Sequence, residues 1–472
     1  VEKMTKLRDH LIDELLKIPK TTINGARNNR ICNNANIGFE YIEGEGLLMH
    51  LNDKGIAVST GSACSSKSLE PSHVLSAIGL RHEVMHGSIR FTLSKYTTQK
   101  EIDYLTKVAV ENKIFKGTSK RNLFQVLNRL ENVGADLNAY TTKEETCIHA
   151  SFLCEHYERT LELFQDIFFN SVFPEKEVEK EKQVVIDEIE SYLDSPSEQI
   201  FDDFEDLLFA GHPLGRNILG TVKGIKKLNR QNLYGFINHA YQLNEVVIAS
   251  VGNIDFRKLV RLFVKYFSHH PERGNSIPRL PFKGNNPVHA IQKKKISQVH
   301  CVVGTTAYPF GHKLRIPLAL LNNLLGGPIM NSRLSLALRE RSGLTYHNES
   351  NYTTFSDTGI ILIYFGTAPA HYEQALSIVF QELKHLREVK LKPAQLHIVK
   401  KQLIGQLAIA QESNLSAMLA IGKSYLLQNK FDPVEVIIER IHSSSADELL
   451  EIANEIFDEK KLSRLTYFPV RT

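Results

Sequence analysis

The sequence predicts an α+β protein made of two similar halves, with a smaller α+β domain in front of them. Amphipathic helical patterns alternate with short apolar strands along most of the 472 residues. A stretch that begins near residue 115 is echoed roughly 210 residues later, as expected for a duplicated domain. A segment rich in Pro, Gly, His and Asn separates the two stretches and is typical of a linker. We therefore expect domains over residues 1–111, 112–270 and 293–472, with a linker at 271–292.

The overall composition argues against several classes of protein. With 42% hydrophobic and 23% charged residues, the chain can form domains with substantial cores. A net charge of +4 over this length does not indicate a nucleic-acid or membrane surface. No apolar run approaches the roughly 18 residues of a membrane span, and the first residues do not have the pattern of a signal peptide. The five cysteines follow no regular spacing, which favours a reducing, cytoplasmic environment.

The front segment alternates helices and short strands. Leucines line one side of a helix predicted over residues 6–17, and a strand is expected in NIGFEYIEG, residues 36–44. A second helix is expected over 45–55, and a third follows Pro71. The sequence HGSIRFTLSKYTT then predicts a strand and a helix start, with an amphipathic helix over 99–111.

A cysteine in the Ser/Gly-rich loop STGSACSS is the candidate nucleophile of this front segment. A thiol in a flexible, exposed loop is accessible to a reaction partner, whereas most single cysteines simply pack in a turn. Three motifs in order, STGSACSS, LEPSHVLSAIGL and HGSIRFTLSKYTT, resemble the C-terminal part of a cysteine desulfurase over about 95 residues. The resemblance implies the small domain of a class V aminotransferase fold (fold type I). It implies Cys64 as the persulfide-forming residue and Arg90 as the residue that binds the substrate carboxylate.

The cofactor of those desulfurases is pyridoxal phosphate, bound to a lysine that follows a histidine in a large upstream domain. That domain is absent, and the only His-Lys pair in the chain, His312-Lys313, lies far downstream. Cys64 could therefore accept sulfur only from another protein, and a sulfur-acceptor protein is the partner that this resemblance implies.

The acidic helix predicted over residues 173–190, FPEKEVEKEKQVVIDEIE, is the central element of the body. Pro174 suits its first turn, and apolar residues recur at helical spacing along one side. Glu181 and Glu188 lie two turns apart and share a face. Such a face is either a solvated acidic surface or part of a metal site.

The neighbouring sequence favours the metal site. FKGT at 115–118 and LENVGADLNAYTTKEETCIHASFL at 130–153, together with EKQVVIDE, resemble the M16 (pitrilysin-type) zinc metallopeptidases of the processing-peptidase-like branch. The resemblance implies two α+β halves and zinc-dependent peptide hydrolysis, with Glu188 as the third zinc ligand. It also implies that the strand containing Asn138 and Ala139 pairs with an extended peptide or protein substrate.

The remaining zinc ligands of that family are missing from this chain. The family's His-x-x-Glu-His helix falls at residues 108–112, which read Val-Ala-Val-Glu-Asn. Glu111 keeps the place of the water-activating glutamate, whereas neither histidine is present. Two histidines at i and i+4 are what chelate one ion on a helix face. We therefore expect no bound zinc and no hydrolysis from the chain as written.

The second half carries its own motif, Arg341-x-Gly343-Leu344-Thr345-Tyr346. By the same resemblance, Arg341 and Tyr346 contact the substrate backbone across the cleft; the alternative for Arg341 is a surface salt bridge. Pro328 follows two glycines where the family often has a third, and it stiffens that loop. In the first half, a buried strand is expected in NEVVIASVGNID, residues 244–255.

Three functional hypotheses follow from the sequence. The body is a non-catalytic peptide-binding subunit, or Cys64 makes the chain a sulfur carrier, or two gene pieces have been joined and neither activity is complete. The first half lacks the family's opening strands, which would expose a sheet edge. Both families commonly work as pairs of chains or of halves, so a homo-oligomer is one expected arrangement.

Overall fold

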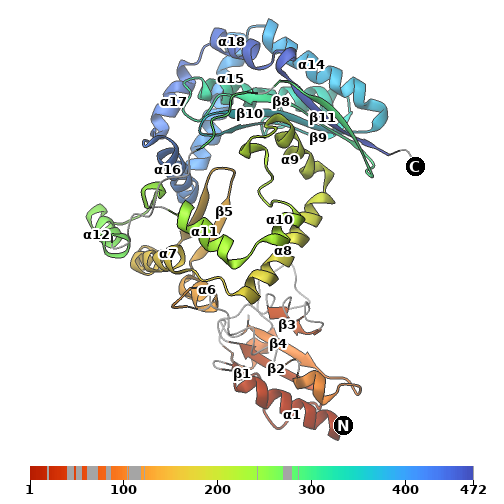
Figure 1. Cartoon of the computed structure of the whole chain (residues 1–472), viewed down its shortest axis with the longest axis vertical. Helices are drawn as coiled ribbons and strands as arrows, with labels where there is room; N and C mark the ends of the chain where they lie inside the picture. Colours follow the sequence, from red (N-terminus) through yellow and green to blue (C-terminus); the bar gives the residue numbers. More distant parts are fainter. Residues whose placement is uncertain are drawn as a thin grey trace. The chain divides into compact units, whose positions relative to one another are not determined.

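The computed structural model describes residues 1–18, 21–39, 47–48, 51, 56–60, 73–80, 85, 87–103, 105, 118–121, 123–241, 243–268, 279–284 and 286–470. These residues form two compact units. The first comprises Val1–Leu137, Ala150–Pro174 and Leu262–Tyr266, and the second comprises Asn138–His149, Glu175–Arg261 and Phe267–Thr472. Helices and sheets are mixed throughout, which confirms the α+β class (Figure 1). None of the helices in the described ranges combines the length and apolarity that a membrane span requires.

A small antiparallel sheet with one long helix forms the front segment. Helix α1 (Glu2–Leu16) buries Leu7, Leu11 and Leu15, the leucine stripe that the sequence predicts. The sheet has the order β1-β2-β4-β3, and its strands are β1 (Thr21–Ile23), β2 (Asn34–Phe39), β3 (Ser59–Thr60) and β4 (Ser88–Thr92).

The core of this front segment is closed by the start of the next helix. Ile37 and Ile89, on neighbouring strands, have no exposed surface and belong to the same buried cluster as the α1 leucines. Ile102 and Leu105 join that cluster, and residues 99–103 and 105 are helical. Helix α3 (His73–Ala77) follows Pro71 as predicted. The rest of the helices expected over 45–55 and 99–111 lies outside the described residues, apart from helical positions 47, 48 and 51.

The first half contains one β-hairpin and a series of helices. The hairpin strands β5 (Asp136–Thr141) and β6 (Thr146–Ser151) form a two-stranded sheet. The acidic helix is confirmed as α8 (Glu175–Leu193), and it is followed by α9 (Pro196–Leu208). The other elements of this half are α6 (Leu123–Glu131), η1 (Cys154–His156), α7 (Tyr157–Asn170), η2 (Pro213–Gly215), α10 (Val222–Lys227), α11 (Arg230–Ala240), η3 (Leu243–Glu245) and α12 (Phe256–Phe267).

The second half is organised around a five-stranded sheet of order β7-β11-β8-β10-β9. Its strands are β7 (His289–Lys294), β8 (Val299–Ala307), β9 (Thr345–Thr354), β10 (Gly359–Thr367) and β11 (Ser463–Pro469). Strand β11 runs parallel to β7, whereas the other neighbours are antiparallel. The accompanying helices are α13 (Arg315–Gly326), the π-helix η4 (Ser335–Arg341), η5 (Pro369–His371), α14 (Tyr372–Glu388), α15 (Pro393–Gln411), α16 (Asn414–Gln428), α17 (Val434–Ser443), α18 (Ala446–Ile456) and η6 (Glu459–Lys461).

Both faces of this sheet are covered by helices. Every residue of β10 is buried, and its side chains alternate between two cores. Ile361 and Ile363 face the helices α13, α14 and α18, whereas Leu362 and Tyr364 face α9. Figure 1 shows the sheet between α14 and α18 on one side and α9 on the other. A helix from the first half thus completes the core of the second.

The order of elements shows the duplication directly. The first half runs β5, β6, η1, α7, α8, α9, and the second runs β9, β10, η5, α14, α15, α16. Tyr157, at the start of α7, and Tyr372, at the start of α14, lie about 215 positions apart, close to the offset expected from the sequence echo. Gly134 and Gly343 adopt positive φ, +68° and +60°, just before β5 and β9 respectively. The structure therefore repeats even the turn that leads into each hairpin.

The buried strand expected over residues 244–255 is wrong. Residues 243–245 form the short helix η3, residues 246–251 belong to no strand, and Ile248 is 40% exposed. The matching segment of the second half is β11, which is held between β7 and β8. The first half has no strands equivalent to β7 and β8 among its described residues, so an apolar run without such neighbours does not become a strand.

Candidate functional site

The acidic helix α8 presents its carboxylates to solvent. Val178, Ile186 and Ile189 are buried, so the predicted apolar stripe is confirmed. Glu181 and Glu188 are both exposed on the remaining surface of the helix. Among the residues that the structure describes, no group of three or more His, Cys, Asp or Glu side chains is arranged to hold a metal ion.

The described donor set does not fit the zinc ion that the resemblance implies. A catalytic zinc normally takes three protein ligands and one water. Here one matching ligand, Glu188, is an exposed carboxylate, and the positions of both histidines carry Val108 and Asn112. Glu111 and these two positions lie outside the described residues. No chemical step through zinc follows from these residues.

Strand β5 has exposed residues at the two positions for which the sequence predicts a substrate contact. Asn138 and Ala139 are both exposed. Tyr140, the next residue of β5, is partly buried, and the centroid of its ring lies 6.1 Å from that of His149 on β6. The Ala139 N–H donates to the Oδ1 of Asn138 at 2.8 Å.

Arg341 and Tyr346 lie on either side of the turn between the π-helix η4 and β9. Arg341 is the last residue of η4 and is exposed, and Tyr346 is 92% exposed. The Gly343 N–H donates to the carbonyl of Arg339 and the Leu344 N–H to that of Leu338, so the turn is tight. π-Helical segments are frequent at functional sites, and this one directs two polar side chains to the surface at the start of β9.

The glycine loop that follows α13 is closely packed. A Cβ on Gly327 would lie 2.4 Å from Asn323 Oδ1, and one on Gly326 would lie 2.7 Å from Ser350. Only glycine fits at both positions. Pro328 comes directly after them, and its ring fixes its backbone angle φ. Both the close packing of the two glycines and the proline therefore restrict the conformation of the loop.

Thr118, the last residue of the FKGT motif, anchors a buried polar network in the first half. Its Oγ1 donates to Asp166 at 2.9 Å and accepts from the Arg121 N–H. The Arg121 guanidinium forms ion pairs with Asp166 and, at 2.5 Å, with Glu162. Although burial opposes it, hydrogen bonds from Asn170, Arg121 and Thr118 lower the pKa of Asp166. The threonine of this motif therefore has a structural role.

Of the two candidate residues of the front segment, Arg90 lies within the described part of the structure. Arg90 is exposed on β4, and its Nη2 donates to Ser59 Oγ at 3.3 Å, across the β3–β4 pair. Cys64 lies outside the described residues.

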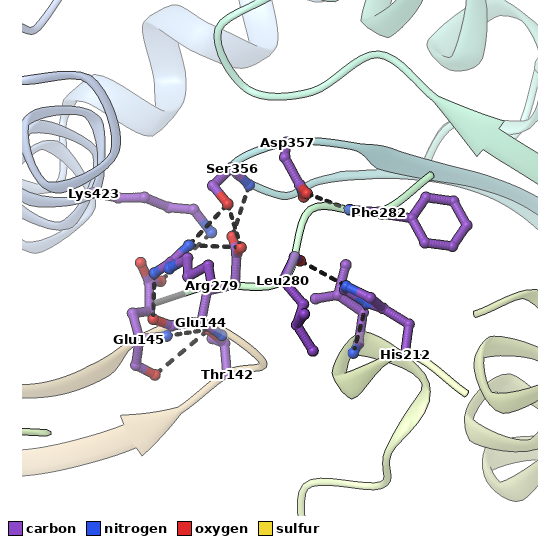
Figure 2. Close-up of polar contacts among 11 residues, drawn as sticks. Thr142, Glu144, Glu145, His212, Arg279, Leu280, Phe282, Ser356, Asp357 and Lys423 are labelled. Atoms are coloured by element: carbon purple, nitrogen blue, oxygen red, sulfur yellow. Dashed lines mark hydrogen bonds and ion pairs between the residues drawn. The ribbon is translucent and has the colours of Figure 1, made fainter. Parts of the chain in front are cut away.

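The tip of the β5–β6 hairpin forms a polar site that the sequence did not predict. The turn residues Lys143, Glu144 and Glu145 have side chains only 10%, 12% and 7% exposed. Hairpin tips normally face solvent, so three charged side chains that are largely covered need an explanation. Figure 2 shows Glu144 and Glu145 surrounded by partners from other segments.

Each charge at the tip has a defined partner. Lys143 pairs with Glu205 of α9 at 3.0 Å and donates to the Arg216 carbonyl at 2.6 Å. Glu145 lies 3.5 Å from Lys423 of α16. Burial raises the pKa of Glu205, and the neighbouring Lys143 only partly offsets this effect.

Glu144 has the richest set of contacts. Its carboxylate accepts from Arg279 Nη1 at 2.7 Å, from the Ser356 N–H at 2.8 Å and from Ser356 Oγ at 2.6 Å. Arg279 belongs to the segment between the halves, and Ser356 to the turn between β9 and β10. Residues of that same segment make two further contacts: His212 Nε2 donates to the Leu280 carbonyl at 2.8 Å, and the Phe282 N–H donates to Asp357 at 2.7 Å (Figure 2).

Comparison with known proteins identifies most of the chain. The pattern of the family described as "Insulinase (Peptidase family M16)" matches residues 109–222, and that of the "Peptidase M16 inactive domain" matches residues 227–403. A Bacillus subtilis relative, "Uncharacterized zinc protease YmxG", is 31% identical over 352 residues, covering 74% of this chain and 85% of the relative. The chain belongs to the M16 peptidase family.

Other relatives agree with this assignment. An uncharacterised zinc protease of Rickettsia felis is 31% identical over 350 residues, covering 74% of this chain and 84% of the relative. A solved M16 inactive domain from Pseudomonas fluorescens has a TM-score of 0.70 at 19% identity, covering 76% of this chain and 86% of that structure. A Helicobacter pylori protease has a TM-score of 0.69 at 21% identity, covering 76% and 88%. These structures share the fold of the M16 body.

The front segment matches a different family. The pattern described as "Aminotransferase class-V" matches residues 1–105, which is consistent with the desulfurase-like motifs around Cys64 and Arg90. The match ends four residues before that of the M16 insulinase pattern begins.

Proposed function

We propose that the M16 body binds extended peptides and that, as written, it does not hydrolyse them by the zinc chemistry of its family. The observation that carries the proposal is the sequence at residues 108–112, where both metal histidines are replaced, by Val108 and Asn112. Glu188 alone supplies one of the three ligands that a catalytic zinc needs. Without the ion, no water of lowered pKa is available to attack a peptide bond.

The residues that the family resemblance assigns to peptide binding are all present in this chain, whereas two of the three assigned zinc ligands are not. The β5 edge exposes Asn138 and Ala139, and Arg341 and Tyr346 stand exposed at the start of β9. An extended peptide that pairs with β5 would gain main-chain hydrogen bonds, and the Arg341 guanidinium could donate to its carbonyls. A protein with these parts and no metal would act as a binding subunit for a peptide or protein ligand.

Zinc content and peptide binding, measured on the same preparation, test the proposal. We expect substoichiometric zinc by atomic absorption, even after dialysis against excess zinc. Fluorescein-labelled insulin B chain should bind, as followed by anisotropy, and should remain uncleaved. Arg341→Ala should weaken binding, whereas Lys390→Ala, which removes an exposed ion pair with Asp447, should not. One zinc per chain together with chelator-sensitive cleavage would overturn the proposal.

Sulfur transfer through Cys64 is the second candidate function. The class V aminotransferase match over residues 1–105 favours it, as do the three desulfurase-like motifs. The pyridoxal phosphate of that family does not fit this segment, because the segment contains no lysine that follows a histidine. Cys64 would therefore carry sulfur supplied by another protein, in the reducing cytoplasm that the cysteine pattern predicts.

Persulfide labelling tests this second function. The wild-type chain, incubated with an active cysteine desulfurase and cysteine, should acquire a label that Cys64→Ser abolishes. Cys154→Ser serves as the control, because Cys154 is an exposed free cysteine outside the front segment. If neither peptide binding nor Cys64 labelling is found, the chain is best explained as two joined gene pieces without a complete activity.

A further inference from the structure

We propose that Glu144 is a positioning residue that holds the peptide-binding strand β5 in place through a clamp formed with Arg279 and Ser356. This inference rests on the proposed peptide binding at β5. It goes further by naming the contacts that fix the position of that strand. The three residues are called the tip clamp below.

The need for a clamp follows from the size of the sheet that contains β5. In the described structure β5 pairs only with β6, and isolated two-stranded hairpins are marginally stable in water. Its counterpart β9 pairs along its length with β10, which pairs in turn with β8 in the middle of a five-stranded sheet. The register of β9 is therefore fixed by neighbours, whereas β5 has to be held by other contacts.

The tip clamp supplies such contacts at one end of the hairpin. A carboxylate that is 12% exposed accepts three hydrogen bonds, one of them from a guanidinium, and such charge-assisted bonds are the strongest kind in proteins. Arg279 also donates to Ser356 Oγ at 2.8 Å and to the Glu144 carbonyl at 3.3 Å. The three residues therefore form a closed set of contacts, so the position of each depends on the other two.

The clamp joins β5 to the second-half sheet, which carries Tyr346, one of the proposed peptide contacts, near the start of β9. Ser356 follows β9, and β9 begins beside Tyr346. At about 3.4 Å per residue, the ten residues of β9 place the clamp roughly 30 Å from that tyrosine. Asn138 and Ala139 precede Glu144 by six and five residues, which is up to about 20 Å along an extended strand. A small rotation of the hairpin at the clamp would therefore move the β5 edge by several ångströms, which would weaken the proposed pairing with a peptide.

Glu144→Ala and Arg279→Ala test the clamp in two readouts. The first readout is the dissociation constant of fluorescein-labelled insulin B chain, which should rise about tenfold in each variant. The second is hydrogen exchange of the backbone amides of residues 136–141, which should become faster while β8 and β10 are unchanged. Arg279 is 54% exposed, so its truncation is compatible with folding even if Glu144→Ala is not. Glu144→Gln keeps one acceptor oxygen of the two, so it can retain only part of the contacts with Ser356 and Arg279 and should have an intermediate effect on both readouts.

The outcomes separate this inference from the proposed function. Unchanged exchange in β5 for both alanine variants would overturn the clamp. Faster exchange with an unchanged dissociation constant would show that the clamp orders the strand without positioning it for binding, which also overturns the inference. If the wild-type chain binds no peptide, the proposed function fails, and the exchange data alone decide whether Glu144 orders β5. Lys390→Ala should leave both readouts unchanged.

Discussion

The two halves of the body repeat one series of elements but are stabilised differently. In the second half, five strands are covered by helices on both faces, and one strand is buried along its entire length. In the first half, a two-stranded hairpin is held by ion pairs at its tip and by a small separate cluster, which in the described residues comprises Val126, Leu130, Ala135 and Leu163. Polar contacts thus fix the position of the β5–β6 hairpin, whereas neighbouring strands fix the position of β9 and β10.

The helices α9 and α16 show the same contrast. They occupy equivalent places in the duplicated order, but α9 buries Ile200, Phe204 and Leu208 against the five-stranded sheet, whereas none of the residues of α16 is fully buried. A Cβ on Gly422 of α16 would lie 3.4 Å from the Cβ of Ala249, which belongs to the first-half segment that does not form a strand. α9 therefore buries apolar side chains completely, whereas α16 leaves its apolar side chains at least partly exposed.

Equivalent truncations on α9 and α16 should differ most. Ile200→Ala should lower the free energy of unfolding by about 3 kcal/mol, because it opens a cavity in a closed core, and Met418→Ala by about 1 kcal/mol, because that side chain is only partly buried. Urea denaturation followed by tyrosine fluorescence measures both, since the chain has no tryptophan and Tyr364 and Tyr467 lie in the sheet. Equal losses would mean that the two helices are covered to the same extent.

The second largest effect on stability is expected from the buried polar network around Thr118 in the first half. Asp166→Asn should cost about 3 kcal/mol, because it leaves Arg121 without one of its two carboxylate partners in a buried site. Glu158→Gln on the same helix α7 is the matched control, because its ion pair with Lys265 is largely exposed. Limited proteolysis of the segment between residues 118 and 171 should become faster for the first variant only. Comparable cleavage rates for the two variants would show that the network around Thr118 does not stabilise the first half.

The pH dependence of Glu205 gives a smaller effect. Burial raises the pKa of this carboxyl in the folded chain above its ordinary value of 4.5, so folding favours the protonated form. Its contribution to stability is therefore greatest below pH 4.5 and is lost as the pH rises through the raised folded value. Glu205→Gln should make the chain more stable than the wild type at pH 7, and the gain should disappear as the pH falls to near 4.5. Melting temperatures across that range would contradict this account if the variant were less stable at neutral pH.

The smallest effect is expected on the surface of the well-covered half. Lys390→Ala removes an ion pair with Asp447 whose side chains are 52% and 67% exposed, so the free energy of unfolding should change by less than about 0.5 kcal/mol. A larger change in urea denaturation would show that exposed pairs contribute to this half as well, and would weaken the contrast with the first half.

Local patterns were sufficient to predict much of this fold. The apolar stripe of α8 and the leucines of α1 each follow from neighbouring residues, and each is confirmed, although α8 begins at Glu175, one residue after Pro174. The segment 244–255 has an equally clear strand pattern but is not a strand, because a strand also needs partners, and those would be distant in sequence.

The tip clamp shows the same limit for the candidate site. Glu144 and Ser356 are 212 positions apart, and Glu144 and Arg279 are 135 apart, so nothing in the spacing of these residues predicts their contact. The residues that the sequence did single out, such as Asn138, Arg341 and Tyr346, were found by family resemblance, and the structure shows that they are exposed. Their roles remain predictions for the binding experiments.

The approach of α9 to β8 has a consequence for the order in which the chain is synthesised. A Cβ on Gly304 of β8 would lie 2.4 Å from the Ile361 carbonyl oxygen and 3.1 Å from the Phe204 ring, so helix and sheet meet without a gap. The ribosome completes α9 long before β8, and β11, which pairs with β8, comes almost at the end of the chain. The apolar face of α9 is therefore without its complete sheet while more than half of the chain is synthesised. Any truncated chain that begins after the linker would make that sheet with one bare apolar face.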